Sequence, residues 1–127
     1  MVTIETIENF LCDLSDTVFN DGIVCDKIYN PEQRETRSVF VNQVLSFGSD
    51  QNGIFRCTAQ LLENREKRSQ CVSDVNIVKE NFTKIGYKLP DGLAIYIELQ
   101  YITMPMKIMV DTQVAYSLSA NFNIIVK

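Results

Sequence analysis

The closing segment, residues 114–126, constrains the fold more than any other part of the sequence. Apolar side chains occupy every second position, at Val114, Tyr116, Leu118, Ala120, Phe122, Ile124 and Val126. Successive side chains of a β-strand point to opposite faces, so this alternation predicts a half-buried strand. The segment exceeds the usual strand of about five or six residues. We therefore expect either a bend within it or an extension that reaches a partner.

Two other segments carry helical spacing. Residues 3–14 place apolar side chains on one helical face, and residues 71–85 do the same with Val72, Val75, Val78, Phe82 and Ile85. We expect the first helix to end near residues 15–16. Gly86 is suited to the position after the second helix, where φ is positive, and Pro90 follows the helix end.

The remaining apolar segments predict strands. Residues 23–29 form a short one, residues 38–47 and 53–63 form a hairpin around the turn-forming residues 48–53, and residues 93–103 form a long one. Pro105 cannot donate to a sheet ladder, so a bend or bulge is expected there. The sequence thus predicts an α+β fold: an antiparallel sheet of about five strands, two helices on one face, in the order α-β-β-β-α-β-β.

Composition favours one globular domain over residues 1–127. Hydrophobic residues make up 46% of the chain and charged residues 22%, and the formal net charge is -4. A domain that grips nucleic acid normally shows a basic excess, so general DNA binding is disfavoured. No apolar run reaches the length of about 18–20 residues that spans a bilayer, and the acidic start does not resemble a signal peptide. We therefore expect no membrane contact, and a reducing compartment for folding.

Few chemistries remain open to this chain. It has no histidine, which removes the commonest general base and metal ligand, and no glycine-rich phosphate-binding motif. The carboxylate pairs Asp13/Asp16 and Glu32/Glu35 are explained by surface solvation. We therefore expect a protein that is not an enzyme, with no catalytic, cofactor or metal site. Its four cysteines have no C-x-x-C spacing and are interpreted as small buried side chains, with a disulfide pair left open: Cys12, Cys25, Cys57 and Cys71.

Two polar loops are candidates for contacts with a partner subunit. Residues 30–37 (NPEQRETR) have no apolar side chain except Pro31, and residues 64–68 (NREKR) form a charged connector. Their mixed charges indicate solvated loops or reciprocal salt bridges between copies of the chain, with a nucleic-acid site as the remaining alternative. The candidate contact residues are Glu32, Arg34, Glu35, Arg37, Arg65, Glu66, Lys67 and Arg68. Met104, Met106 and Met109 flank Pro105 and suit either core filling or an adaptable apolar contact.

The order of these elements resembles the tail terminator and tail-completion proteins of long-tailed bacteriophages, a family that includes head–tail connector and minor capsid components. The segments that carry the resemblance are residues 3–14, 38–63, 71–85 and 114–126. The likeness lies in layout and not in a motif, so no site residue is transferred.

The resemblance implies a virion protein, assembled in the host cytoplasm, that forms a homo-oligomeric ring, typically of six subunits. Such a ring caps the tail tube, contacts tail-tube and head-connector proteins, and lets DNA pass through its lumen without specific binding. An acidic chain suits a lumen that repels DNA. The alternative is a small non-enzymatic protein-binding or regulatory module, and an enzyme using surface carboxylates ranks last.

Overall fold

Strand β7 (Gln113–Val126) is the centre of the sheet in the computed structural model, which describes residues 2–46 and 54–127. It pairs with β3 (Phe55–Arg65) along one side and with β5 (Ala94–Ile102) and β6 (Met106–Val110) along the other. The predicted alternation is confirmed from Leu118 on, because Leu118, Ala120, Phe122, Ile124 and Val126 are all buried. It is wrong at the start of the strand, where Ala115 is buried and Val114 and Tyr116 are only half-buried. The strand is continuous over 14 residues.

The predicted α+β fold is confirmed, with more strands than expected. The other elements are α1 (Ile4–Phe19), β1 (Cys25–Asp26), β2 (Thr36–Ser46), α2 (Arg68–Asn81) and β4 (Lys84–Lys88). The sheet runs β1-β2-β3-β7-β5-β4, with β6 also paired to β7, which makes seven strands among the described residues. All pairings are antiparallel except β1 with β2, which is parallel and contradicts our expectation for neighbouring strands. The predicted turn at residues 48–53 lies outside the described residues.

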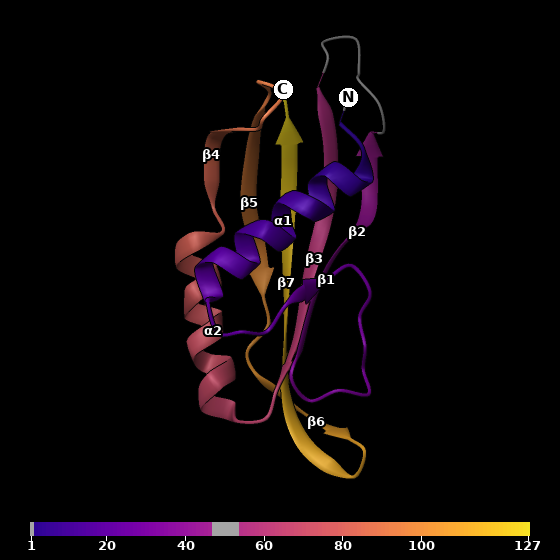
Figure 1. Cartoon of the computed structure of the whole chain (residues 1–127), viewed down its shortest axis with the longest axis vertical. Helices are drawn as coiled ribbons and strands as arrows, with labels where there is room; N and C mark the ends of the chain where they lie inside the picture. Colours follow the sequence, from indigo (N-terminus) through magenta and orange to yellow (C-terminus); the bar gives the residue numbers. More distant parts are fainter. Residues whose placement is uncertain (1, 47–53) are drawn as a thin grey trace.

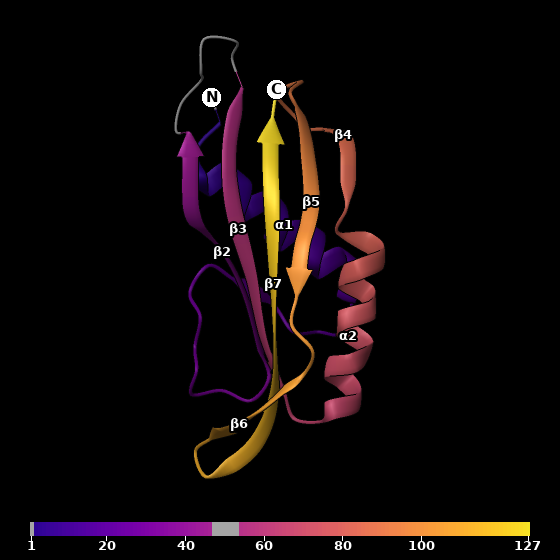
Figure 2. The ribbon, with the colours of Figure 1, turned by 180° about the vertical axis from the view of Figure 1, so that it is seen from behind.

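The helices lie on one side of the sheet. Figure 1 shows α1 crossing the sheet diagonally with α2 beside it, and Figure 2 shows no helix over the opposite face of β2, β3, β7 and β5. Three rings join the layers: Phe82 stacks on Phe122 of β7 at 5.4 Å between centroids, and Phe19 of α1 lies 6.1 Å from Phe82. The uncovered face is polar around Gln60, whose side-chain amide donates to the Ser119 hydroxyl at 2.7 Å.

Both helices differ from their predicted bounds. α1 continues to Phe19 because Ser15 and Phe19 extend the buried stripe of Ile7 and Leu11 at four-residue spacing. α2 ends at Asn81, so the expected helix end at Gly86 is wrong. Gly86 lies instead inside β4, at a φ of 69° and at an irregularity in the pairing with β5, which is typical of a bulge.

A long bent hairpin forms the other side of the sheet. β5 stops at Ile102 and β6 starts at Met106, so the chain bends around Pro105 as predicted. A two-residue turn then joins Val110 to Gln113. In Figure 1 the tip formed by β6 and the start of β7 projects beyond α2 at one end of the molecule.

The turn of this hairpin carries local strain. Asp111 and Thr112 have φ values of 47° and 65°, the left-handed values of a type I′ turn. Thr112 is β-branched and adopts this region only at a cost of about 1–3 kcal/mol.

We expect Thr112→Gly to raise the free energy of unfolding by about 1 kcal/mol, as measured by urea denaturation. Gln113→Gly, one residue into the strand, is the matched control and should lower stability; a loss of stability in Thr112→Gly would contradict the strain argument.

Candidate functional site

The most unusual feature of the fold is a cluster of five charged side chains, four of them buried and one, Asp21, exposed, which we call the charge cluster. It comprises Asp21 after α1, Arg37 on β2, Glu63 and Arg65 on β3, and Asp74 on α2. Arg37 and Glu63 are directly opposite each other in the β2–β3 pairing, and both are fully buried. Four separate parts of the chain therefore meet through charged groups.

Arg37 is surrounded on all sides. Its Nη2 donates to Asp21 Oδ2 at 2.9 Å and to Glu63 Oε1 at 2.5 Å, and its Nη1 donates to the Ile23 carbonyl at 3.3 Å. The guanidinium carbon lies 3.6 Å from the centre of the Phe19 ring. A planar guanidinium fits this arrangement because it can bond in its plane and stack on an aromatic face.

Arg65 joins the Asp21 carboxylate to the Asp74 carboxylate of α2. Its Nη1 donates to Asp74 Oδ2 at 2.7 Å and to Asp21 Oδ2 at 2.9 Å. Asp21 also accepts the Ile23 backbone N–H at 3.0 Å, which fixes the turn that carries it. The loop before β2 is held nearby by Asn64, which accepts from the Tyr29 hydroxyl and donates to the Gln33 carbonyl.

The balance of charges changes the acidity of two carboxyl groups. Three carboxyls face two guanidiniums, so one carboxyl has no cation to balance it when all three are ionised. Burial, together with the adjacent Asp74 carboxyl, raises the pKa of Glu63 to about 8. Hydrogen bonds from Arg37 and from the Ile23 N–H outweigh burial at Asp21 and lower the pKa of that carboxyl to about 2.

The three carboxyls also resemble a set of metal ligands. Oxygen atoms of Asp21, Glu63 and Asp74 lie within 4.8 Å of one another. However, Nη2 of Arg37 and Nη1 of Arg65 already bond to these oxygens at 2.5–2.9 Å. The arginines therefore occupy the carboxyl oxygens and balance two of the three carboxyl charges, and the cluster is best explained as a structural junction.

The predicted contact residues divide into three groups. Arg37 was expected in an exposed loop, which is wrong, because β2 begins at Thr36 and Arg37 is 0% exposed. Arg65 is 8% exposed and is likewise occupied inside the chain. Arg34 and Glu66 form a surface ion pair at 3.1 Å that joins the two loops within one molecule. The others, Glu32, Glu35, Lys67 and Arg68, are exposed, and their role in subunit contacts stays a prediction.

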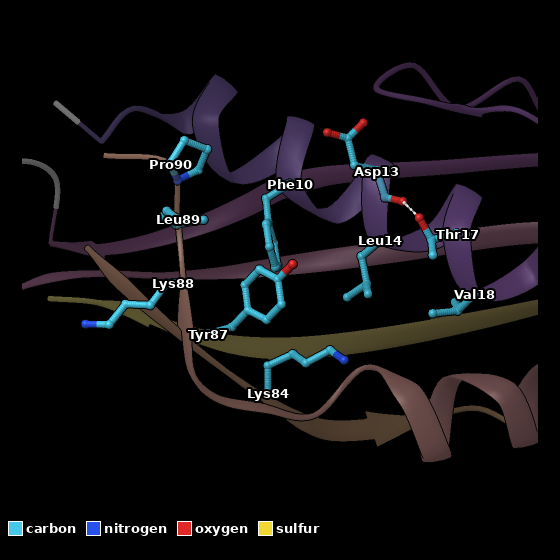
Figure 3. Close-up of a pocket in the computed structure, with 10 residues that line it drawn as sticks. All are labelled: Phe10, Asp13, Leu14, Thr17, Val18, Lys84, Tyr87, Lys88, Leu89 and Pro90. Carbon is cyan, nitrogen blue, oxygen red and sulfur yellow. Dashed lines mark hydrogen bonds between the residues drawn. The ribbon is translucent and has the colours of Figure 1, made fainter. Parts of the chain in front are cut away.

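An apolar groove lies on the helix side of the molecule, between α1 and β4. It has a volume of about 550 Å³ and is lined mainly by Phe10, Leu14, Val18, Tyr87 and Leu89. Figure 3 shows Phe10 and Tyr87 meeting from opposite walls, with ring centroids 5.3 Å apart. The rim carries both signs of charge, from Asp13 on α1 and from Lys84 and Lys88 on β4.

A second apolar surface lies along the bent hairpin. Met104, Met106 and Met109 are 57–65% exposed, so core filling, one of the two interpretations of these methionines, is wrong for all three. Tyr101 at the end of β5 is 59% exposed and adds an aromatic ring to this surface. Lys107 and Asp111 provide charges of both signs on the hairpin.

No protein-family model matches the chain, and no curated protein is similar to it in sequence. Neither helix in the described part of the chain has the length and apolar character to cross a membrane.

The three carboxyl residues of the charge cluster were not among the predicted contact residues, although the sequence pattern contained a signal for two of them. Glu63 continues the alternation of Phe55, Cys57, Ala59 and Leu61 on the buried face of β3. Asp74 lies in phase with Cys71, Val75 and Val78 on the buried face of α2. A charged residue at an apolar phase indicates a buried charge with a partner.

Removing one member of the cluster should strongly lower the free energy of unfolding. Arg37→Met leaves Glu63 and Asp21 without their main cation, and we expect a loss of about 3–5 kcal/mol in the free energy of unfolding, measured with urea. Arg34→Met, which breaks the exposed pair with Glu66, is the matched control and should cost about 1 kcal/mol or less. Equal losses in the two variants would contradict a structural role for the cluster.

Glu63 should make stability depend on pH. The unfolded chain releases the Glu63 proton near pH 4.5, whereas the folded chain holds it to about pH 8. The folded state binds more protons between these values, so stability falls as pH rises through this window. Glu63→Gln should flatten that fall in urea titrations at several pH values. An unchanged slope would show that Glu63 is ionised in the folded protein.

Below about pH 4, Asp21 has the opposite effect, because stability is lost as its carboxylate is protonated.

Proposed function

We propose that the chain is a structural assembly protein that forms a closed ring by head-to-tail contacts, in the manner of a phage tail terminator. The observation that supports this most is the presence of two different apolar surfaces on one small molecule. One is the projecting hairpin with its exposed methionines, and the other is the groove between α1 and β4. In Figure 1 the hairpin tip projects at one end of the molecule, away from α1 and β4, the elements that line the groove.

The hairpin is suited to insertion into a partner. Two strands alone have marginal stability in water, and this pair carries exposed apolar side chains. Burying a methionine side chain fully contributes about 1.5–3 kcal/mol, and the flexible thioether adapts to an irregular surface. Met106 and Met109 lie three positions apart in β6 and therefore point to opposite faces of the hairpin, so a partner that encloses the tip would bury both.

The groove is suited to receive such an insertion from a second copy. Its apolar floor matches the methionines, and its rim offers Asp13 to Lys107 and Lys84 or Lys88 to Asp111. Each contact would join the hairpin of one copy to the groove of the next. Because the two surfaces differ, the contact is heterologous, and repeated contacts close into a ring when the rotation permits it.

The resemblance in element order supports a virion as the setting for this ring. A hexameric ring would cap the tail tube, contact the head connector, and leave a lumen for DNA to pass. The net charge of -4 favours a lumen that does not hold DNA. Glu32, Glu35, Lys67 and Arg68 would add reciprocal salt bridges at the ring contacts.

Complementation between two variants tests the head-to-tail contact. Met106→Asp/Met109→Asp removes the hairpin surface, and Tyr87→Asp removes the groove surface. Each variant alone should be monomeric in light scattering at micromolar concentration, where the natural chain forms a ring. A mixture should form dimers, since the hairpin of the groove variant still fits the groove of the hairpin variant.

Val24→Asp is the control, because Val24 is 76% exposed and lies on neither surface. It should leave the ring intact. A natural chain that stays monomeric, or two variants that remain monomers when mixed, would contradict the proposal.

Genes for tail-tube and portal proteins beside this gene would support the phage assignment, and metabolic neighbours would contradict it.

The groove also favours the second candidate, a small non-enzymatic binding or regulatory module. An apolar channel between a helix and an edge strand can accept a peptide from another protein, with Phe10 and Tyr87 as the contact rings. A monomer whose Tyr87→Asp variant loses binding to an apolar peptide, while the hairpin variant keeps it, would support this function over the ring.

A further inference from the structure

Two of the four cysteines face each other inside the fold. Cys12 on α1 and Cys25 on β1 are separated by 13 positions in sequence, and their Sγ atoms lie 2.7 Å apart. Cys12 is 9% exposed and Cys25 is 8% exposed, whereas Cys57 and Cys71 in the core are only 1% and 0% exposed. The two facing thiols are therefore also the two cysteines nearest to solvent.

Regular structure holds both cysteines in place. Cys12 lies within α1, and Asp16, one helical turn later, accepts the Cys25 backbone N–H at 3.0 Å. On its other side, Cys25 pairs with Arg37 in the β1–β2 ladder. The helix and the sheet therefore set the separation of the two sulfur atoms.

We propose that Cys12 and Cys25 form a thiol–disulfide site, which low-molecular-weight disulfides such as oxidised glutathione convert from the dithiol to an internal disulfide. The Cys12 thiolate attacks one sulfur of oxidised glutathione, whose S–S bond breaks and releases one glutathione thiolate. The Cys25 thiol then loses its proton, and its thiolate attacks Cys12 Sγ. The second glutathione thiolate leaves as the Cys12–Cys25 bond forms. Both cysteines are oxidised, one oxidised glutathione is reduced to two thiols, and the two cysteine protons end on those thiols.

The surroundings select Cys12 as the attacking group. The hydrogen bond with Cys25 lowers the pKa of the Cys12 thiol, with a further contribution from Lys27, and the same hydrogen bond and burial raise the pKa of Cys25. Access requires only a local opening, because β1 has two residues and lies at the edge of the sheet.

The disulfide would act on the charge cluster. It closes the segment 13–24, which carries Asp21, the carboxylate shared by Arg37 and Arg65. Closing a loop of this size restricts the unfolded chain and keeps Asp21 near its partners when the structure opens. Oxidation should therefore stabilise the whole protein.

The test uses the purified full chain incubated with oxidised glutathione. Thiol titration after denaturation should show a loss of two of the four thiols. Mass spectrometry of an alkylated digest should show a peptide that joins Cys12 to Cys25. The midpoint of thermal unfolding should rise by about 5–10 °C and return on treatment with dithiothreitol.

Single-cysteine variants separate the steps. Cys25→Ser should accumulate a glutathione adduct on Cys12, because the second attack is missing. Cys57→Ser is the matched control and should still form the internal disulfide. Retention of all four thiols, glutathione adducts without an internal bond in the natural chain, or a bond that involves Cys57 or Cys71 would overturn the proposal. These results do not depend on ring formation, and mapping in the natural chain decides the question even where a variant fails to fold.

Discussion

The charge cluster is the interaction on which the arrangement of the elements depends. Arg37 and Arg65 bring the turn after α1, the β2–β3 pair and α2 to one point through three carboxyl groups. Apolar packing is tolerant of small shifts, whereas a buried guanidinium must keep each of its partners within hydrogen-bond distance. The cluster thus fixes where α2 and the end of α1 lie relative to the sheet.

The long hairpin of β5, β6 and β7 has two roles along its length. The part formed by β5 and the end of β7 belongs to the core, where Ile95 and Ile97 pack beside the buried face of β7. Beyond Pro105 the same strands leave the body and expose Met106 and Met109. The bend therefore separates the part that stabilises the monomer from the part that we propose contacts another copy. The groove on the helix side is built independently, by α1 and β4.

The residues that resisted prediction are those whose environment is set by distant parts of the chain. Arg37 belongs to a polar run in sequence and is buried because Glu63 and Asp21 reach it. Ile85 belongs to the helical stripe in sequence, yet it is 85% exposed because α2 ends at Asn81 and β4 pairs with β5 instead. A local pattern cannot report such partners, since they arise from contacts between residues far apart in sequence.

The sequence by itself determined the α+β class, the buried face of residues 118–126, the apolar stripe of the first helix and the bend at Pro105. Each follows from a period of two or 3.6 residues, or from the missing N–H of proline, which are local properties. Only the tertiary structure decided that β1 runs parallel to β2, that Cys12 meets Cys25, and that four buried charged side chains meet the exposed Asp21 at one site. These depend on which elements become neighbours, and that choice is made by the packing of the whole chain.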